Sequence, residues 1–184
     1  MYFKNIRKAI GNYLLKAEVS QLKRNKAAFN MAEAKTFAIV FEASKIEDVE
    51  LVKKYVVYLK EMKKKVRIIG YFDTLYPPDF TYSKLEYEFF SIKELTWYLK
   101  PAGTFLPVFA EEEFDVLIDL NIHDHFPLKY VSALSRAHFK VGKFSEENKN
   151  IFDLLIDFEK DKTFKYFLRQ VDIYLDMINK KTTP

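Results

Sequence analysis

Two of the chain's three histidines lie at the end of an apolar run, in FDVLIDLNIHDHFP, residues 114–127. The polar groups that end this stretch are Asp119, Asn121, His123, Asp124 and His125. Imidazole and carboxylate groups can together bind zinc or iron, or act as a general base and the group that orients it. Because side chains alternate along an extended chain, Asp119, Asn121 and His123 would project from one side. We treat these three as candidate ligand-binding residues, with His123 as a candidate base.

The same stretch also has a structural interpretation. Asp124 is well placed to cap a helix that begins around His125 to Pro127, since aspartate is favoured at the N-cap and proline in the first turn. His125 could chelate a metal together with His123 only if the chain stayed extended, and Pro127 indicates that it turns. No third strong ligand stands at a diagnostic spacing, so the sequence predicts no metal and no cofactor.

A further aspartate occurs in a similar setting. The segments FDVLIDL, residues 114–120, and FDLLIDF, residues 152–158, share their apolar pattern. If both form parallel strands of one sheet, Asp119 and Asp157 lie near the carboxyl ends, where open α/β sheets bind ligands. Alternatively, each aspartate ends its strand and turns or caps the backbone. His123, Asp119 and Asp157 are therefore the candidate catalytic residues, and Asp157 joins the candidate ligand-binding set.

Several common chemistries are missing from the sequence. There is no GxGxxG or GxxxxGK[ST] motif, and the first strand-to-helix turn, EASKIEDVE at residues 42–50, carries carboxylates where a phosphate site needs glycine. Neither Ser44 nor Ser91 stands on the glycine-flanked elbow of a Ser/His/Asp hydrolase. The absence of cysteine excludes disulfides, thiolate metal ligands and cysteine nucleophiles. These absences favour binding over catalysis.

Positive charge is concentrated at the start of the chain. Residues 1–35 contain eight lysines and arginines and two glutamates, a net charge of +6, so the remaining chain carries −2 of the overall +4. Four of the basic residues form a candidate surface for nucleic acid or a protein partner: Lys16, Lys23, Arg24 and Lys26. Such a surface could contact phosphates of RNA or the ribosome, or could lie on an anionic membrane. The third interpretation is a helix docked on the body or on a second subunit, with its charges solvated.

Hydrophobic periodicity predicts the elements that must position these groups. Strands are expected at residues 36–43, 66–73, 86–90, 114–120, 138–142 and 151–158. Helices are expected at residues 2–28, 45–62, 92–99, 125–136 and 162–180, the second and third preceded by capping-box pairs, Ser44 with Glu47 and Ser91 with Glu94. The first helix would bury Phe3, Ile6, Ile10, Tyr13, Leu14 and Ala17. The last would bury Phe164, Phe167, Leu168, Val171, Tyr174, Leu175 and Ile178.

Strands that alternate with helices indicate a mostly parallel sheet covered on both faces. We therefore predict a three-layer, Rossmann-like α/β domain at residues 31–184, with residues 1–30 as a basic amphipathic helix joined to it. No apolar stretch reaches the ~20 residues of a membrane span, and charges interrupt the amino-terminal segment, unlike a signal peptide. The expected location is the cytoplasm.

Two resemblances accompany these patterns. The basic amphipathic start, the block FDVLIDLNIHDHFPLKYVSALSRAHFKVG and the strand IFDLLIDF resemble a family of small uncharacterised bacterial proteins, a domain of unknown function. That resemblance implies bacterial origin and an α/β domain but no activity. Residues 114–144 are also similar to a strand–helix–strand unit in the acceptor half of heptosyltransferase-type glycosyltransferases. This chain lacks the length for their nucleotide-sugar-binding half, so transferase activity is not expected.

Together these observations predict a non-catalytic cytoplasmic α/β protein, a binding or assembly factor. It would contact RNA, the ribosome or a protein partner through its basic amino-terminal helix, and a homo-oligomer is compatible with the sequence. The alternative is a small enzyme or ligand-binding domain, sugar- or nucleotide-related, that uses the carboxyl edge of the sheet.

Overall fold

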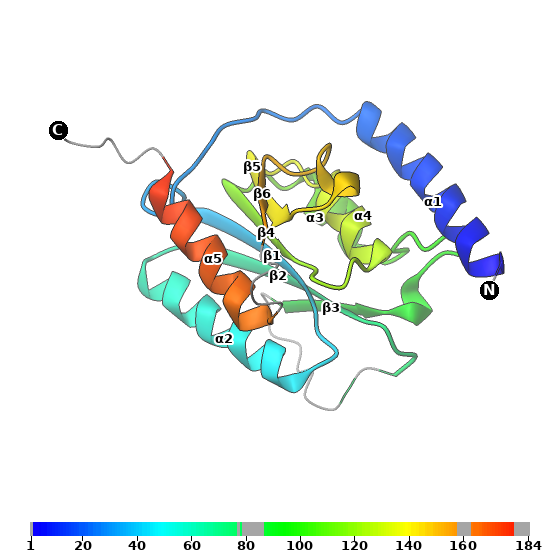
Figure 1. Cartoon of the computed structure of the whole chain (residues 1–184), viewed down its shortest axis with the longest axis horizontal. Helices are drawn as coiled ribbons and strands as arrows, with labels where there is room; N and C mark the ends of the chain where they lie inside the picture. The colour runs from blue at the N-terminus through cyan, green and yellow to red at the C-terminus, as the bar shows by residue number, and fades with distance from the viewer. Residues whose placement is uncertain (1, 77, 79–86, 158–162, 179–184) are drawn as a thin grey trace.

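A computed structural model describes residues 2–76, 78, 87–157 and 163–178 (Figure 1). Its six strands form one sheet in the order β3-β2-β1-β4-β5-β6, and all pairings between them are parallel. The strands are β1 (Thr36–Glu42), β2 (Lys65–Phe72), β3 (Tyr87–Ser91), β4 (Val116–Leu120), β5 (Phe139–Lys143) and β6 (Leu154–Ile156). This is the strand order of doubly wound α/β folds, so the predicted three-layer, Rossmann-like architecture is confirmed.

Helices cover both faces of the sheet (Figure 1). One face carries α2 (Ile46–Glu61) and α5 (Phe164–Met177), and the other carries α1 (Tyr2–Ser20), α3 (Phe105–Glu111) and α4 (Phe126–Leu134). Two single 3₁₀ turns, η1 (Ile92–Glu94) and η2 (Glu146–Asn148), complete the described elements.

The central strands are buried on both sides, as parallel strands between two helical layers must be. Along β1, Phe37, Ile39 and Phe41 pack toward α2 and α5, while Ala38 and Val40 pack toward α4. This alternation divides the apolar interior into two cores. The side chains of Val49, Val52, Val56 and Leu59 form the buried face of α2, and most of the stripe predicted for the last helix, α5, is buried as well. Two residues of the predicted stripe are exceptions: Tyr174 is exposed, and Ile178, which follows the last residue of α5, is partly buried.

Two predicted helix starts differ from the structure. The N-cap of α2 is Lys45 rather than Ser44, and no side chain caps it. After Ser91 the predicted helix is only the 3₁₀ turn η1, although the Glu94 carboxylate does accept the Ser91 backbone N–H at 2.7 Å. Leu95 is already extended and bridges to Pro101, so the capping pair closes one turn and the chain then leaves the helical conformation. The short helix α3 was not predicted from the sequence.

The first helix is shorter than predicted and buries a different face. It ends at Ser20, and its side chains that are buried against the body include Leu15, whereas Ile6 and Tyr13 of the predicted stripe are 52% and 74% exposed. Gly11 explains the choice of face, because a Cβ atom there would lie 2.7 Å from the Phe126 ring. The missing side chain lets the helix backbone approach α4 closely, which no larger residue on the apolar stripe allows.

The close approach at Gly11 leads to a stability prediction. In an unhindered helix interior, Gly→Ala stabilises by about 1 kcal/mol. Here the added methyl group meets Phe126 and the Tyr98 backbone, so we expect Gly11→Ala to lower the free energy of unfolding by about 1–3 kcal/mol, measured by urea denaturation. Ala9→Gly, at an exposed position of the same helix, reports intrinsic propensity alone and should cost about 1 kcal/mol. A stabilised Gly11→Ala variant would contradict the observed docking.

Candidate functional site

The carboxyl ends of β1 and β4 lie side by side at the centre of the sheet, with Phe41 paired to Leu120. From this point the chain leaves β1 toward α2 on one face and leaves β4 toward α4 on the other. Such a divergence is a topological switch point, and open α/β sheets bind ligands outside the carboxyl ends of the strands at such a point. Glu42 ends β1 at this switch point, and the residues that follow β4 lie across from it.

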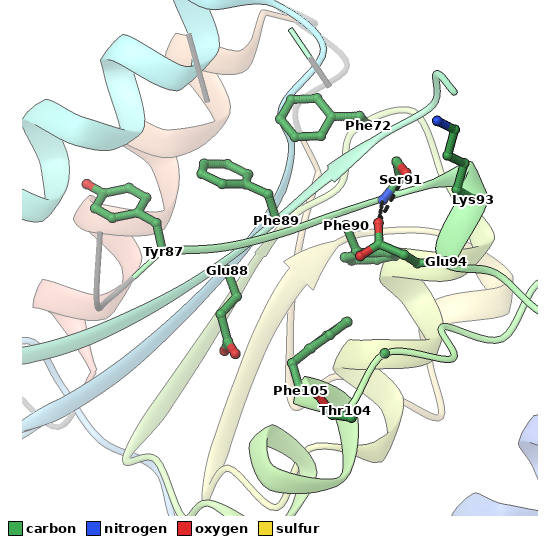
Figure 2. A pocket seen from close by; sticks show the side chains of 11 residues that line it. Phe72, Tyr87, Glu88, Phe89, Phe90, Ser91, Lys93, Glu94, Thr104 and Phe105 are labelled. Atoms are coloured by element: carbon green, nitrogen blue, oxygen red, sulfur yellow. Dashed lines mark hydrogen bonds between the residues drawn. The ribbon is translucent and has the colours of Figure 1, made fainter. Parts of the chain in front are cut away.

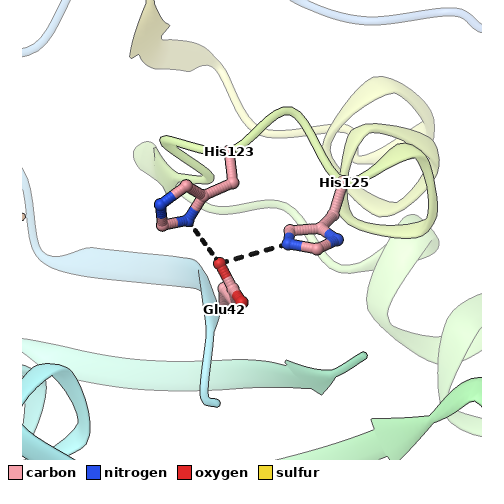
Figure 3. Close-up of side chains that lie close together, drawn as sticks. All are labelled: Glu42, His123 and His125. Atoms are coloured by element: carbon pink, nitrogen blue, oxygen red, sulfur yellow. Dashed lines mark hydrogen bonds and ion pairs between the residues drawn. The ribbon is translucent and has the colours of Figure 1, made fainter. Parts of the chain in front are cut away.

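Glu42, His123 and His125 meet at this switch point (Figure 3). The Glu42 Oε2 atom lies 2.5 Å from His123 Nδ1 and 3.1 Å from His125 Nε2. Each residue offers one possible ligand atom, and these atoms all lie within 4.8 Å of one another. The Glu42 side chain is 17% exposed and that of His123 is 47% exposed, so the cluster has a sheltered base and an open side.

The loop after β4 holds both imidazoles toward Glu42. Asp119 accepts the Asn121 backbone N–H at 2.8 Å. The Asn121 side chain then binds the His125 backbone twice, accepting its N–H at 2.8 Å and donating to its carbonyl at 2.9 Å. Asp124 adopts a positive φ of 56°, which turns the chain between the two histidines. Asp119 and Asn121 thus build the loop that presents the imidazoles.

The predicted capping role of Asp124 is wrong. The N-cap of α4 is His125, and no side chain caps that helix end. Asp124 instead pairs with Lys143 Nζ at 2.5 Å, because its left-handed backbone directs it away from the helix start.

Further carboxylates surround the cluster. Asp73 Oδ2 lies 4.0 Å from His125 Nδ1, on the side of the ring away from Glu42, and Asp73 accepts a hydrogen bond from the Tyr71 hydroxyl at 2.8 Å. The centroids of the Tyr71 and His125 rings lie 5.5 Å apart. The carboxyl ends of β1 and β2 therefore supply negative charge to two histidines from the loop after β4.

The electrostatics of the cluster favour positive charge. Burial would raise the pKa of Glu42, but the hydrogen bond and charge of His125 and the hydrogen bond of His123 outweigh it and lower that pKa to about 2. For His125, burial alone would lower the pKa, yet the contact with Glu42 reverses this and the pKa is raised. Glu42 is consequently an anion throughout the physiological pH range, in contact with the His125 imidazole, whose pKa is raised.

The remaining residues predicted for the carboxyl edge are not all brought together. Asp157 follows β6, and β5 separates that strand from β4, so Asp157 is not joined to Asp119. The sequence patterns do not indicate Glu42 as a site residue. They indicate it only as one of the carboxylates that disfavour a phosphate site after the first strand. Its position at the end of the first strand was the available signal, because the first strand of a doubly wound sheet is central.

The basic surface is divided by the structure. Lys16, Lys23 and Lys26 are exposed, and Lys26 lies 3.3 Å from Asp153. The Arg24 side chain is only 8% exposed, because it donates to the carbonyls of Ala137 and His138 and pairs with Asp153. Arg24 therefore fastens the connection after α1 to the sheet, and the solvent-facing lysines are what a partner could reach.

A groove of about 580 Å³ runs beside the edge strand β3 (Figure 2). Its walls are largely aromatic, including Phe72, Phe89 and Phe105. The two carboxylates in its lining already have partners. Glu94 accepts the Ser91 backbone N–H, and Glu88 pairs with Arg67 at 2.6 Å. The groove therefore offers apolar surface but fewer groups that could act as ligands or bases than the histidine–carboxylate cluster at the ends of β1 and β4.

Fold and site together define a doubly wound α/β domain with a histidine–carboxylate cluster at its topological switch point. The chain belongs to a family of unknown function, DUF6913, whose model matches residues 7–178, which confirms the expected membership in such a family. No curated protein and no solved structure matches the chain. The local similarity to heptosyltransferase-type enzymes is not shown by these comparisons. Among the described helices, none has the length and apolar character to cross a bilayer.

The buried carboxyl group of Asp119 leads to a pH prediction. Burial raises its pKa to about 6 although the Asn121 backbone N–H donates to it. Between about pH 4, where an unfolded aspartate loses its proton, and pH 6, the native protein keeps a proton that the unfolded chain has lost. The contribution of Asp119 to the free energy of unfolding therefore falls as the pH rises through this window.

Asp119→Asn removes this titration and keeps an oxygen acceptor for Asn121. We expect the variant and the wild type to unfold with similar free energies near pH 4, and the variant to be more stable at pH 7 by on the order of 1–3 kcal/mol. Urea denaturation from pH 4 to pH 8 measures the difference, in which groups common to both proteins cancel. A difference that does not change with pH would contradict the prediction.

Proposed function

We propose that the protein binds a cationic ligand at the carboxyl edge of its sheet, at the switch point between β1 and β4. The observation that carries this proposal is the meeting of Glu42 with His123 and His125 at the switch point. The Glu42 carboxylate supplies negative charge, and the two imidazoles in their neutral form supply nitrogen lone pairs to the same small volume. These are the groups that a bound cation requires.

The surrounding charge supports a cation over a nucleotide or other phosphate. In dinucleotide-binding domains, the pyrophosphate lies at the amino end of the helix after the first strand. Here the first turn of that helix, α2, carries Glu47 and Asp48, and Glu42 stands just before it. Asp73 adds a second carboxylate beside His125, whereas Asp124 is paired with Lys143. Like charges there would repel an anionic ligand. We therefore propose a cation, rather than a nucleotide or other phosphate, as the ligand.

The test compares ligand classes on one protein. Isothermal titration of the wild type with divalent metal ions, spermidine, NAD⁺ and a nucleotide sugar should give binding to at least one of the cations and none to the nucleotides. Glu42→Gln should weaken the cation by about tenfold or more, because it removes the charge at the base of the cluster. Glu61→Gln, the same change at the exposed end of α2, should leave the affinity unchanged. Nucleotide binding that Glu42→Gln leaves intact or strengthens would contradict the proposal.

A second candidate function follows from α1, and we propose that its outer face contacts a macromolecular partner. Docking through Gly11 and Leu15 holds Ile6 and Tyr13 outward, on a helix that also exposes Lys16. Exposed aromatic and aliphatic side chains beside lysines suit a protein or RNA surface. This retains the expected binding or assembly role, with Arg24 assigned to the fold.

Affinity purification from the native cell, with and without nuclease and salt, tests this second function. We expect the partner recovered with the wild type to be lost when Tyr13→Ala is combined with Lys16→Glu and Lys23→Glu. The matched control reverses Lys54 and Lys165, exposed lysines on the helices of the opposite face, and should retain the partner. Association that survives the triple variant at every salt concentration would exclude this surface.

A further inference from the structure

The donor atoms at the switch point are of types that prefer particular metal ions. This inference rests on the proposed cation site and names its ligand: we infer that Glu42, His123 and His125 hold a divalent transition metal ion of the zinc, cobalt, nickel or ferrous type. Calcium and magnesium prefer an all-oxygen environment, whereas imidazole nitrogen together with one carboxylate suits these borderline ions. The sequence predicted no metal because no third ligand was apparent, and Glu42 from the neighbouring strand is that third ligand.

The distances between the donor atoms suit one shared ion. Zinc lies about 2.0–2.2 Å from nitrogen and carboxylate ligands, so two ligands of a tetrahedral ion are roughly 3.4 Å apart. The carboxylate oxygen of Glu42 lies 2.5 Å from one imidazole nitrogen and 3.1 Å from the other, and no pair of the three donor atoms exceeds 4.8 Å. Side-chain adjustments on the order of 1 Å therefore complete the geometry. Figure 3 shows both rings directed at the same oxygen.

The backbone already places the ligands. Glu42 stands at the end of a central, buried strand, and the Asn121 side chain fixes the loop that carries both histidines through its two bonds to His125. The positive φ of Asp124 lets two histidines that are two residues apart face one point although the chain is not extended. A site fixed in this way loses little conformational freedom when an ion binds.

Asp73 lies where an outer partner of a metal-bound imidazole is needed. Histidine ligands usually donate their second ring N–H to a carboxylate, which orients the ring and raises its basicity. Asp73 Oδ2 is 4.0 Å from His125 Nδ1, the nitrogen opposite the one that faces Glu42, and Tyr71 holds Asp73 at 2.8 Å. A small rotation of the His125 ring brings that N–H to Asp73. We therefore assign Asp73 as a positioning residue.

The three protein donors leave coordination positions for water or a small ligand. His123, 47% exposed, lies on the open side of the cluster, so these positions face solvent. Structural zinc sites use four protein ligands, whereas sites with three keep a position for an exchangeable group. An ion bound at this site would accordingly be accessible rather than enclosed.

Cobalt(II) provides the test, because its visible absorption reports the ligand environment directly. Protein without a polyhistidine tag, stripped with chelator and titrated with Co²⁺, should bind one equivalent with a visible absorption change that Zn²⁺ reverses. His125→Ala and Glu42→Gln should each weaken binding by more than about tenfold, and Asp73→Asn by about 10–100-fold with a changed spectrum. His138→Gln is the control, because this third histidine lies away from the cluster and contacts the Asn25 carbonyl. This variant should change neither the Co²⁺ affinity nor the absorption spectrum.

The outcomes separate this inference from the proposed function. Spermidine or Mg²⁺ binding that depends on Glu42, without Co²⁺ binding, would overturn the metal assignment and leave the cation site standing. Absence of binding by every cation, with circular dichroism showing folded protein, would overturn both. Co²⁺ binding that survives both His125→Ala and Glu42→Gln, or that is lost in His138→Gln, would place the ion elsewhere and also overturn the assignment.

Discussion

The parallel pairing of β1 with β4 is the contact on which both the architecture and the site depend. Phe37 to Phe41 align with Val116 to Leu120 at the centre of the sheet, and residues of both strands are buried from both faces. Because the two strands end together while their connections leave to opposite faces, Glu42 is brought to the loop that carries His123 and His125. Neither strand alone supplies a site, and a slip in their register would separate the carboxylate from the imidazoles.

The loop after β4 converts this strand pairing into a defined geometry. Asp119 and Asn121 direct their oxygens and amide group at backbone atoms, and Asp124 takes the left-handed conformation that a short polar side chain tolerates. The buried polar groups of Asp119 and Asn121 therefore stabilise the loop, while the His123 side chain is 47% exposed and that of His125 is 19% exposed.

The elements that sequence patterns predict well here are those whose local signal agrees with their burial. Runs of valine, isoleucine and phenylalanine predict the central strands, and the spacing of Val49, Val52 and Val56 predicts the buried face of α2. Prediction failed where contacts distant in the sequence decide the outcome. The docking of α1 depends on the close contact between Gly11 and Phe126. The helix predicted after Ser91 ends after one turn, where Leu95 bridges to Pro101. The hydrophobic periodicity of the sequence indicates neither of these contacts.

The site shows the same limit. His123, His125 and Asp119 can be singled out from their types and spacing, but Glu42 lies about eighty residues earlier and becomes a neighbour only through the strand order. Arg24, which composition places with the exposed lysines, is buried because its guanidinium group satisfies two carbonyls and Asp153. Local chemistry indicates which residue types are available, and topology determines which of them meet.

The most direct measurement for the switch-point site is a crystal structure of the protein grown with Zn²⁺, with diffraction recorded on both sides of the zinc absorption edge. The expected result is an anomalous peak about 2.0–2.2 Å from His123 Nδ1, His125 Nε2 and a Glu42 oxygen, with Asp73 turned to the second nitrogen of His125. Fully ordered side chains at the switch point without such a peak, or a zinc ion only at His138 or another surface position, would contradict the proposed metal site.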